Sequence, residues 1–236
     1  MRLSKRLLIL FGVFATSPLF LTSEALAEIF KTSHKLSGFS TDSEHYIYVE
    51  TAQDPVSDEP QGYLQIVDVA NNSCVSNGCI DTDYLNASSS SSSEAANELL
   101  EETAYLRYQL KLNNPSPGRR LAAIAHKSDA RGVDIYDFRL PNGEILTLRM
   151  LQRSIPSVVN GGDAPRDQAA LGLDVTHNWR TRTLSSLNNY REGIIRYKLR
   201  EVRLAPNGKN AVIIFNVIRP ASMGAMQGTL VQSFAL

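Results

Sequence analysis

The sequence has few cysteines, a modest share of charged residues and almost no tryptophan, and these shortages exclude several classes of protein. Only two of its 236 residues are cysteine, one is tryptophan, and 24 basic residues balance 24 acidic ones. Two cysteines cannot form a disulfide-dense mini-scaffold, and zero formal charge argues against a dedicated nucleic-acid-binding protein. A 43% apolar fraction with 20% charged residues argues against intrinsic disorder. These values predict a globular chain with a hydrophobic core.

Motifs that identify enzymes or metal sites are also missing. The four histidines show no H-E-x-x-H or related spacing, and neither a G-x-S-x-G elbow nor a phosphate-binding G-x-x-x-x-G-K is present. Asp81-Thr82-Asp83 begins like a calcium loop, but Leu85 occupies the next ligand position. The sequence therefore predicts no catalytic residue, no metal ligand and no cofactor.

The first 27 residues predict an export signal. Three basic residues precede a mostly apolar stretch, residues 7–21, and Ala25-Leu26-Ala27 fits an A-x-A cleavage site. The apolar stretch is shorter than the roughly 20 residues that a membrane-spanning helix needs. We therefore expect a signal peptide over 1–27, a mature chain that begins at Glu28 without a transmembrane segment, and a secreted or periplasmic location. The basic residues are Arg2, Lys5 and Arg6.

The two cysteines, Cys74 and Cys79, lie in one short segment. In an exported chain they are expected to pair, and Asn77-Gly78 supplies a turn between them. A redox pair or a metal site is the alternative, but the four intervening residues do not make a C-x-x-C motif and no second pair completes a zinc site. We predict a structural disulfide, which on the chain-entropy estimate stabilises the fold by roughly 2 kcal/mol.

Strand-like segments dominate the rest of the chain. β-Branched and aromatic residues concentrate in residues 46–51 and 63–69. Asn-Gly turns predict two hairpins, 133–140 with 144–151 and 194–204 with 211–218, and residues 229–234 predict a last strand. The sequence predicts a single mainly-β domain over 28–236, made of antiparallel hairpins in a sandwich-like or partial propeller-like arrangement.

One helix is predicted among these strands, over residues 94–112. Residues 88–93 are six serines, which predict a Ser-rich linker. Ser91 and Glu94 have the spacing of a capping box. Ala95 and Leu99 begin an apolar stripe at helical spacing, so we expect the helix to pack on a sheet.

A basic segment is the first candidate binding surface. Arg196, Lys198 and Arg200 alternate with apolar residues, so a strand would place all three cations on one face. Such a row suits an anionic envelope component or an acidic protein partner. The alternatives are a solvated edge that deters edge pairing, or cations that pair with residues 28–118, where 14 acidic residues face 4 basic ones.

Trp179 is the second candidate, beside His177 and Asn178 in a segment that reads as a loop. An exposed tryptophan there would indicate contact with a sugar or a protein. Tryptophan is more often at least partly buried, and burial is therefore the competing expectation.

Several segments follow one another in an order that resembles a known family. They are residues 36–40 (Leu-Ser-Gly-Phe-Ser), 63–69, the helical segment, 118–121 (Gly-Arg-Arg-Leu), and 205–209 (Ala-Pro-Asn-Gly-Lys) before 211–217. This order is similar to the uncharacterised family of predicted secreted proteins called domain of unknown function 2259. The turn-and-strand units also weakly resemble the blades of TolB-like propellers. The family resemblance implies an exported, mostly β protein and brings no activity with it.

These observations predict an exported cell-envelope protein that acts as a non-enzymatic binding or interaction module. An envelope hydrolase with an unrecognised site and a structural accessory protein are the alternatives. Paired carboxylates or a His–Asp pair in a deep pocket would favour the hydrolase, whereas a broad basic or aromatic face would favour binding.

Overall fold

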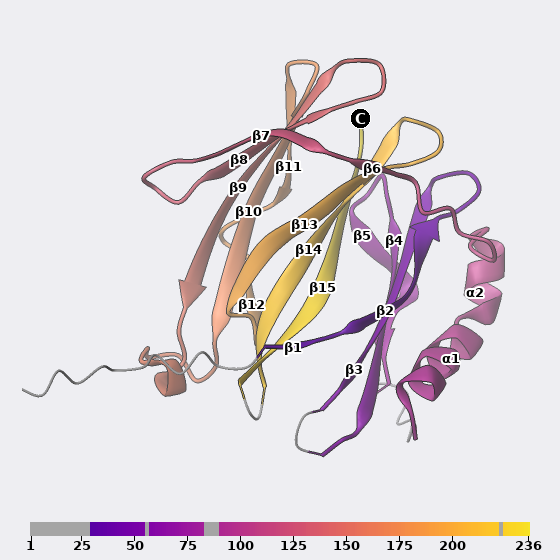
Figure 1. Ribbon diagram of the computed structural model, residues 1–236, viewed down its shortest axis with the longest axis vertical. Helices are drawn as coiled ribbons and strands as arrows, with labels where there is room; N and C mark the ends of the chain where they lie inside the picture. Colours follow the sequence, from indigo (N-terminus) through magenta and orange to yellow (C-terminus); the bar gives the residue numbers. More distant parts are fainter. Residues whose placement is uncertain (1–28, 55–56, 83–89, 222–223) are drawn as a thin grey trace, which may run out of the picture.

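The computed structural model describes residues 29–54, 57–82, 90–221 and 224–236, which form three sheets and two short α-helices (Figure 1). The predicted signal peptide, residue 28 and residues 88–89 of the predicted linker lie outside the described residues. The prediction of a mainly-β fold with antiparallel hairpins is confirmed. Within the described ranges, no helix is long and apolar enough to cross a membrane.

Every strand pairing in the three sheets is antiparallel except that of β1 with β15. The central sheet contains, in order, β1 (Ile29–Lys31), β15 (Gly224–Ala235), β14 (Asn210–Ala221), β13 (Arg196–Leu204) and β6 (Arg119–Leu121). The β7–β11 sheet contains β11 (Arg180–Ser185), β10 (Gln168–His177), β9 (Ile145–Ile155), β8 (Asp134–Arg139) and β7 (Ala123–Ser128), with β12 (Tyr190–Glu192) also paired to β10. The β2–β5 sheet contains β2 (Ser33–Phe39), β3 (His45–Gln53), β4 (Pro60–Asp68) and β5 (Ser73–Asp81).

The central sheet is buried on both faces. Ile213 and Phe215 of β14 belong to the core shared with the β7–β11 sheet, whereas Val212 and Ile214 belong to the core shared with the β2–β5 sheet. This explains why β14 reads as a continuous apolar run instead of an alternating one. The sheets stack in layers, as in the sandwich-like alternative, and do not radiate from an axis as propeller blades do (Figure 1).

The helical segment covers the outer face of the β2–β5 sheet, where Leu99 packs with Ile47 and Leu64. Instead of one helix it forms α1 (Ser92–Glu102) and α2 (Ala104–Gln109). The division lies at Thr103, whose side-chain hydroxyl donates to the Leu99 carbonyl (2.7 Å). Such back-bonding by threonine bends and weakens helices. The predicted capping box forms in part: Ser91 Oγ accepts from the backbone N–H of Glu94 at 3.2 Å, whereas the Glu94 carboxylate accepts from the N–H and hydroxyl of Ser90.

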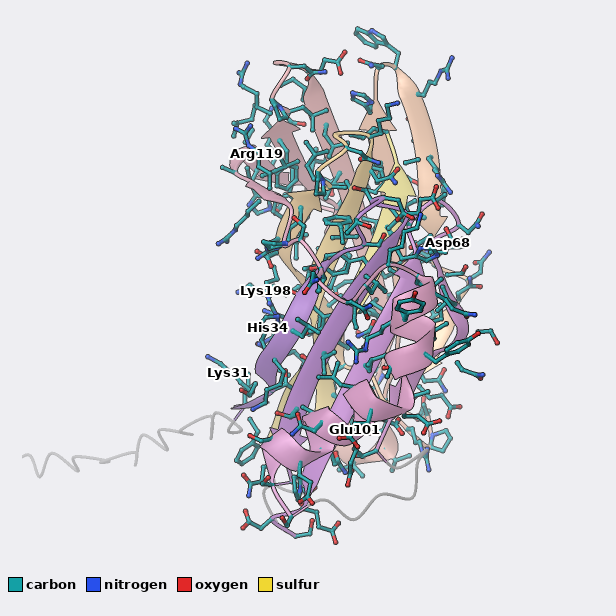
Figure 2. The ribbon with its side chains drawn as sticks, turned by 90° about the vertical axis from the view of Figure 1, so that its right-hand side faces the viewer. Lys31, His34, Asp68, Glu101, Arg119 and Lys198 are labelled. Atoms are coloured by element: carbon teal, nitrogen blue, oxygen red, sulfur yellow. A yellow bond between two sulfur atoms is a disulfide. The ribbon has the colours of Figure 1, made fainter. Side chains whose placement is uncertain are left out.

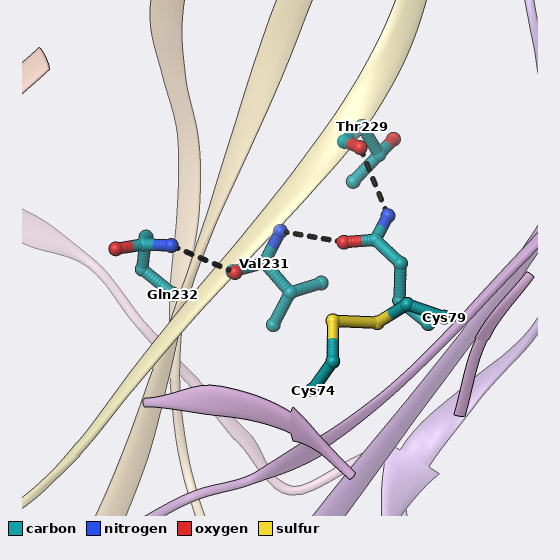
Figure 3. The surroundings of a disulfide bond; sticks show 6 residues. Cys74, Cys79, Thr229, Val231 and Gln232 are labelled. Atoms are coloured by element: carbon teal, nitrogen blue, oxygen red, sulfur yellow. Dashed lines mark hydrogen bonds between the residues drawn. A yellow bond between two sulfur atoms is a disulfide. The ribbon is translucent and has the colours of Figure 1, made fainter. Parts of the chain in front are cut away.

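The predicted disulfide is confirmed: Cys74 and Cys79 of β5 are joined by an S–S bond of 2.03 Å. It lies where the β2–β5 sheet meets β15 (Figure 3). Beside it, Gln65 of β4 donates to the Thr229 carbonyl (2.9 Å) and accepts from the Val231 N–H (3.2 Å). These two bonds tie the β2–β5 sheet to the backbone of the central sheet.

Candidate functional site

Three arginines surround one buried carboxylate at the edge of the central sheet. Glu201 of β13 is only 8% exposed. Arg203 places Nε 3.1 Å from Oε1 and Nη2 3.3 Å from Oε2 of Glu201. Arg120 of β6 places Nε 3.4 Å from Oε2, and Arg200 places Nη2 3.9 Å from Oε1. We call these four residues the arginine cluster, in which three positive charges face one negative charge.

A β-bulge at Arg200 creates this cluster. The register of β13 against β14 shifts at this residue, and a bulge of this kind reverses which side chains face inward. Tyr197, before the bulge, and Val202, after it, both face the core shared with the β7–β11 sheet. Glu201 and Arg203 are therefore left on the other face of the strand, where Arg203 lies directly opposite Arg120 of β6.

The expected row of exposed cations exists only in part. Arg196 and Lys198 are exposed, and neither makes an ion pair or side-chain hydrogen bond with another described residue. Arg200 is different: its side chain is 33% exposed, its Nη1 donates to Tyr48 Oη (2.8 Å), and its Cζ lies 5.5 Å from the Tyr48 ring centroid. The expectation of three cations on one wet face is wrong for Arg200, because the bulge directs it toward β3.

The arginine cluster borders a cavity of about 370 Å³. Arg120, Arg200 and Glu201 form its charged wall, and Tyr136 and Leu199 contribute to the remainder. The cavity therefore combines an apolar floor with guanidinium groups at its side. Sequence reasoning missed Arg120 as a member of the site, because β6 joins β13 only through the tertiary fold.

The electric field of the arginine cluster reaches His34 on β2. The rings of His34 and Tyr48 are tilted by 49° to each other, with centroids 5.3 Å apart, and His34 lies along the same side of the molecule as Lys198 (Figure 2). Partial burial, followed by Arg200 and Arg203, holds the pKa of His34 below its ordinary value. The carboxylates of Glu50 and Glu201 act in the opposite direction but do not reverse the shift.

Trp179 lies apart from the cluster, at the tip of the β10–β11 hairpin. His177 pairs with Arg180, so Asn178 and Trp179 form a two-residue turn, with left-handed φ values of 49° and 64°. The Trp179 side chain is fully exposed, at 102% of the reference area. The expectation of partial burial is therefore wrong, and the segment is a tight turn between two strands instead of a longer loop.

Ser128, His126 and Asp134 meet on β7 and β8, but not in the geometry of a catalytic triad. His126 Nε2 lies 3.2 Å from Asp134 Oδ1 and 3.5 Å from Ser128 Oγ, so one ring nitrogen faces both partners. The Ser128 hydroxyl also donates directly to Asp134. A triad requires the nucleophile on one nitrogen and the carboxylate on the other. This exposed trio does not form a proton relay.

Asp42, Glu44 and His45 bring three possible metal-binding atoms within 4.8 Å of one another. Asp42 Oδ1 already accepts from the Ser40 hydroxyl (2.6 Å), and Lys111 Nζ lies 2.9 Å from Oδ2. Partial burial would raise the pKa of Asp42, but the hydrogen bonds from Ser40 and Lys111 hold it at about 2. Ser40 and Lys111 therefore account for the ionised carboxylate of Asp42 without a metal ion.

Comparison with known proteins identifies a family but no individual relative. No curated protein and no solved structure matches the chain. The sequence profile of the family described as "Predicted secreted protein (DUF2259)" matches residues 52–231. This match covers well over half of the chain and includes both the arginine cluster and Trp179. The chain therefore belongs to the DUF2259 family of predicted secreted proteins.

Proposed function

We propose that this protein is a non-enzymatic binding module of the cell envelope, which holds a phosphate or carboxylate group of an envelope polymer at the arginine cluster. The observation that carries the proposal is the excess of guanidinium groups over carboxylates beside a cavity. Arg120, Arg200 and Arg203 share the single carboxylate of Glu201. An anion in the cavity would compensate the remaining positive charge.

The three arginines have different parts in this proposal. Arg203 is fixed by Glu201 and by the Pro117 carbonyl, to which its Nη1 donates at 3.0 Å. Arg120 contacts Glu201 through Nε alone, and Arg200 uses Nη1 on Tyr48. Arg120 and Arg200 therefore retain N–H donors that border the cavity. Guanidinium groups bind phosphate and carboxylate through paired hydrogen bonds, which suits these two residues to anion binding.

Arg196 and Lys198 serve in the proposal as an approach surface. Both residues are exposed and lie on β13, before the bulge and on the same strand as Glu201. Exposed cations act across water, so they raise the association rate of an anionic partner more than they raise its affinity. Their effect is expected to weaken as salt rises, since screening acts over about 10 Å at 0.1 M.

The same contacts favour binding over the hydrolase alternative. Both Glu201 oxygens are engaged by arginines, so this carboxylate is poorly placed to act as a general base. The exposed trio of Ser128, His126 and Asp134 lacks the relay geometry described above. Among the described residues, neither group supplies the base and nucleophile that hydrolysis requires.

The test is a titration of the mature chain with polyphosphate and, separately, with polygalacturonate. Calorimetry measures binding, and NMR measures the pKa of the His34 ring. A double variant, Arg120→Gln with Arg200→Gln, removes the two guanidinium groups that border the cavity. A matched control, Arg153→Gln with Arg166→Gln, removes two exposed arginines that lie outside both the cluster and the β10–β11 hairpin.

We expect at least one polymer to bind the wild-type chain and to raise the pKa of His34, because the anion offsets the field of Arg200. Hydrogen bonds to charged groups contribute about 1.5–3 kcal/mol each. The cluster variant should therefore weaken binding tenfold or more, while the control leaves it nearly unchanged. Equal binding by the wild type and the cluster variant, or no binding of either polymer, would refute the proposal.

A further inference from the structure

We propose that the tip of the β10–β11 hairpin, formed by Trp179 and the basic residues around it, docks onto the surface of an anionic phospholipid membrane. This site is separate from the arginine cluster and does not depend on the function proposed above. It rests on four observations: exposure, backbone conformation, rigidity and charge.

The tip projects from one end of the molecule, together with the neighbouring β8–β9 turn (Figure 1). The β8–β9 and β10–β11 turns extend past the other turns at that end (Figure 1). Trp179 is fully exposed, although a tryptophan side chain normally buries much of its area. The hairpin therefore places the indole of Trp179 where a surface that binds this end of the molecule would contact it directly.

The backbone at the tip is unfavourable for a tryptophan. Both turn residues have left-handed φ values, 49° at Asn178 and 64° at Trp179. Two-residue hairpin turns of this kind favour Asn-Gly, since glycine adopts positive φ without steric cost. Here Trp179 occupies the position that suits glycine. Local strain of this sort at an exposed side chain is typical of binding and functional sites.

The tip is also held rigidly. Glu144 comes directly before the neighbouring strand β9. Its Oε2 lies 2.8 Å from His177 Nε2, and its Oε1 accepts a hydrogen bond from Asn178 Nδ2 at 3.3 Å. One carboxylate thus fastens the two hairpin tips to each other. A rigid tip inserts its side chain with little loss of conformational entropy on binding.

Basic side chains surround the tip. Arg139 lies at the end of β8, and Arg180 follows Trp179 directly. Lys209 lies beside Leu236, since its carbonyl accepts from the backbone N–H of Leu236 (2.8 Å), and Leu236 lines the same groove as Arg180. All three basic residues are exposed, and no ion pair of theirs occurs within the described ranges. The carboxylate at the tip, that of Glu144, already contacts the side chains of His177 and Asn178. The tip is therefore complementary to anionic headgroups.

The position of the indole favours a lipid surface over a sugar. A groove of about 550 Å³ lies beside the hairpin and is lined by Arg180, Arg182 and Phe234, among others, but not by Trp179. A sugar bound in this groove would therefore not pack against the indole. A lone projecting indole flanked by cations suits the membrane–water interface, where tryptophan is enriched.

The experiment uses the fluorescence of Trp179, since it is the only tryptophan of the chain. The mature protein is mixed with vesicles of phosphatidylglycerol and phosphatidylcholine, with vesicles of phosphatidylcholine alone, and with soluble polygalacturonate. Emission wavelength, quenching by iodide and co-sedimentation are measured. Trp179→Gly, Arg139→Gln with Arg180→Gln, and Tyr105→Ser, which removes another exposed aromatic residue, are compared by sedimentation.

We expect a blue shift and protection from iodide only with the anionic vesicles, both reduced by high salt. Trp179→Gly should abolish sedimentation while raising the melting temperature, because glycine relieves the left-handed backbone. The double arginine variant should weaken sedimentation at least several-fold, whereas Tyr105→Ser and the cluster variant Arg120→Gln with Arg200→Gln should not. An unshifted spectrum, undiminished sedimentation of Trp179→Gly, or a blue shift with polygalacturonate alone would overturn the proposal.

Discussion

Arg200 combines contacts that hold two sheets together with a place in the wall of the cavity. It donates to Tyr48, lies over that ring, and faces both Glu201 and the cavity. Lys198, two positions earlier, is exposed and has no such contacts. The difference arises from the bulge, which turns one cation of an alternating row toward the neighbouring sheet. The alternation of charged and apolar residues in the sequence does not predict this bulge, since a bulge depends on how the strand pairs with its partner.

Replacement of Arg200 by Gln should raise the pKa of His34. Burial lowers this pKa first, and Arg200 is the next contribution, so its removal returns the pKa part of the way to its ordinary value. A His pKa below its unfolded value means that stability is lost as pH falls through the unfolded value toward the folded one. Arg200→Gln should therefore lessen the loss of stability between pH 7 and 5.

The measurement is an NMR titration of the His34 ring together with thermal unfolding at several pH values. Lys198→Gln is the matched control and should change neither quantity appreciably. Arg200→Gln should also cost about 1 kcal/mol of stability at pH 7 through the lost bond to Tyr48. A His34 pKa that stays the same in Arg200→Gln would contradict this interpretation.

At the scale of elements, the features predicted correctly are those fixed by local sequence. Gly143 adopts a left-handed φ of 89° in the β8–β9 turn, as its Asn-Gly pair predicts. The cap at Ser91 is equally local. The sequence does not predict strand β10, because Gln168–His177 has few β-branched residues; pairing with β9 along its length holds the strand instead. Without that strand, the sequence around Trp179 indicates a loop.

Removal of the disulfide should weaken β5 without changing the fold. The bond closes a short loop within one element, so replacing Cys74 and Cys79 with Ser should lower the free energy of unfolding by roughly 2 kcal/mol. The pairing of β4 with β5 and the contacts of Gln65 with β15 remain to hold the strand. Urea unfolding measures the change, and the reduced wild-type chain provides the matched comparison. A loss of cooperative unfolding in the variant would show that the bond does more than restrict the unfolded chain.

At the scale of the whole molecule, the acidic half of the chain, residues 28–118, meets the basic half, residues 119–236 with 17 basic and 9 acidic residues, through an apolar core. Val212 and Ile214 of the central sheet pack with Tyr46 and Val67 of the β2–β5 sheet. The carboxylate that the arginine cluster shares, Glu201, comes from the basic half itself. The expected neutralisation of one half by the other therefore does not account for this cluster. Charge counts could not show this, because they do not say which side chains face each other.

Signal-peptide cleavage after Ala27 should leave the folded domain intact, because the first strand, β1, begins at Ile29. The exported protein should have the intact mass of residues 28–236, with the disulfide formed. Changing Ala25 and Ala27 to Leu should block the cut and leave the longer chain attached to the membrane fraction. An exported protein that retains Met1 would contradict the predicted processing.

The parallel pairing of β1 with β15 has a consequence for the timing of folding. Residues 29–31 lie beside residues 225–227, so the central sheet is completed only when almost the entire chain has been made. The β2–β5 sheet also lacks a partner for its inner face until β14 and β15 arrive. Contacts so distant in sequence form late and slowly. If the predicted signal peptide directs export of the unfolded chain, we expect this order of assembly to delay completion of the core until the last strands have been made.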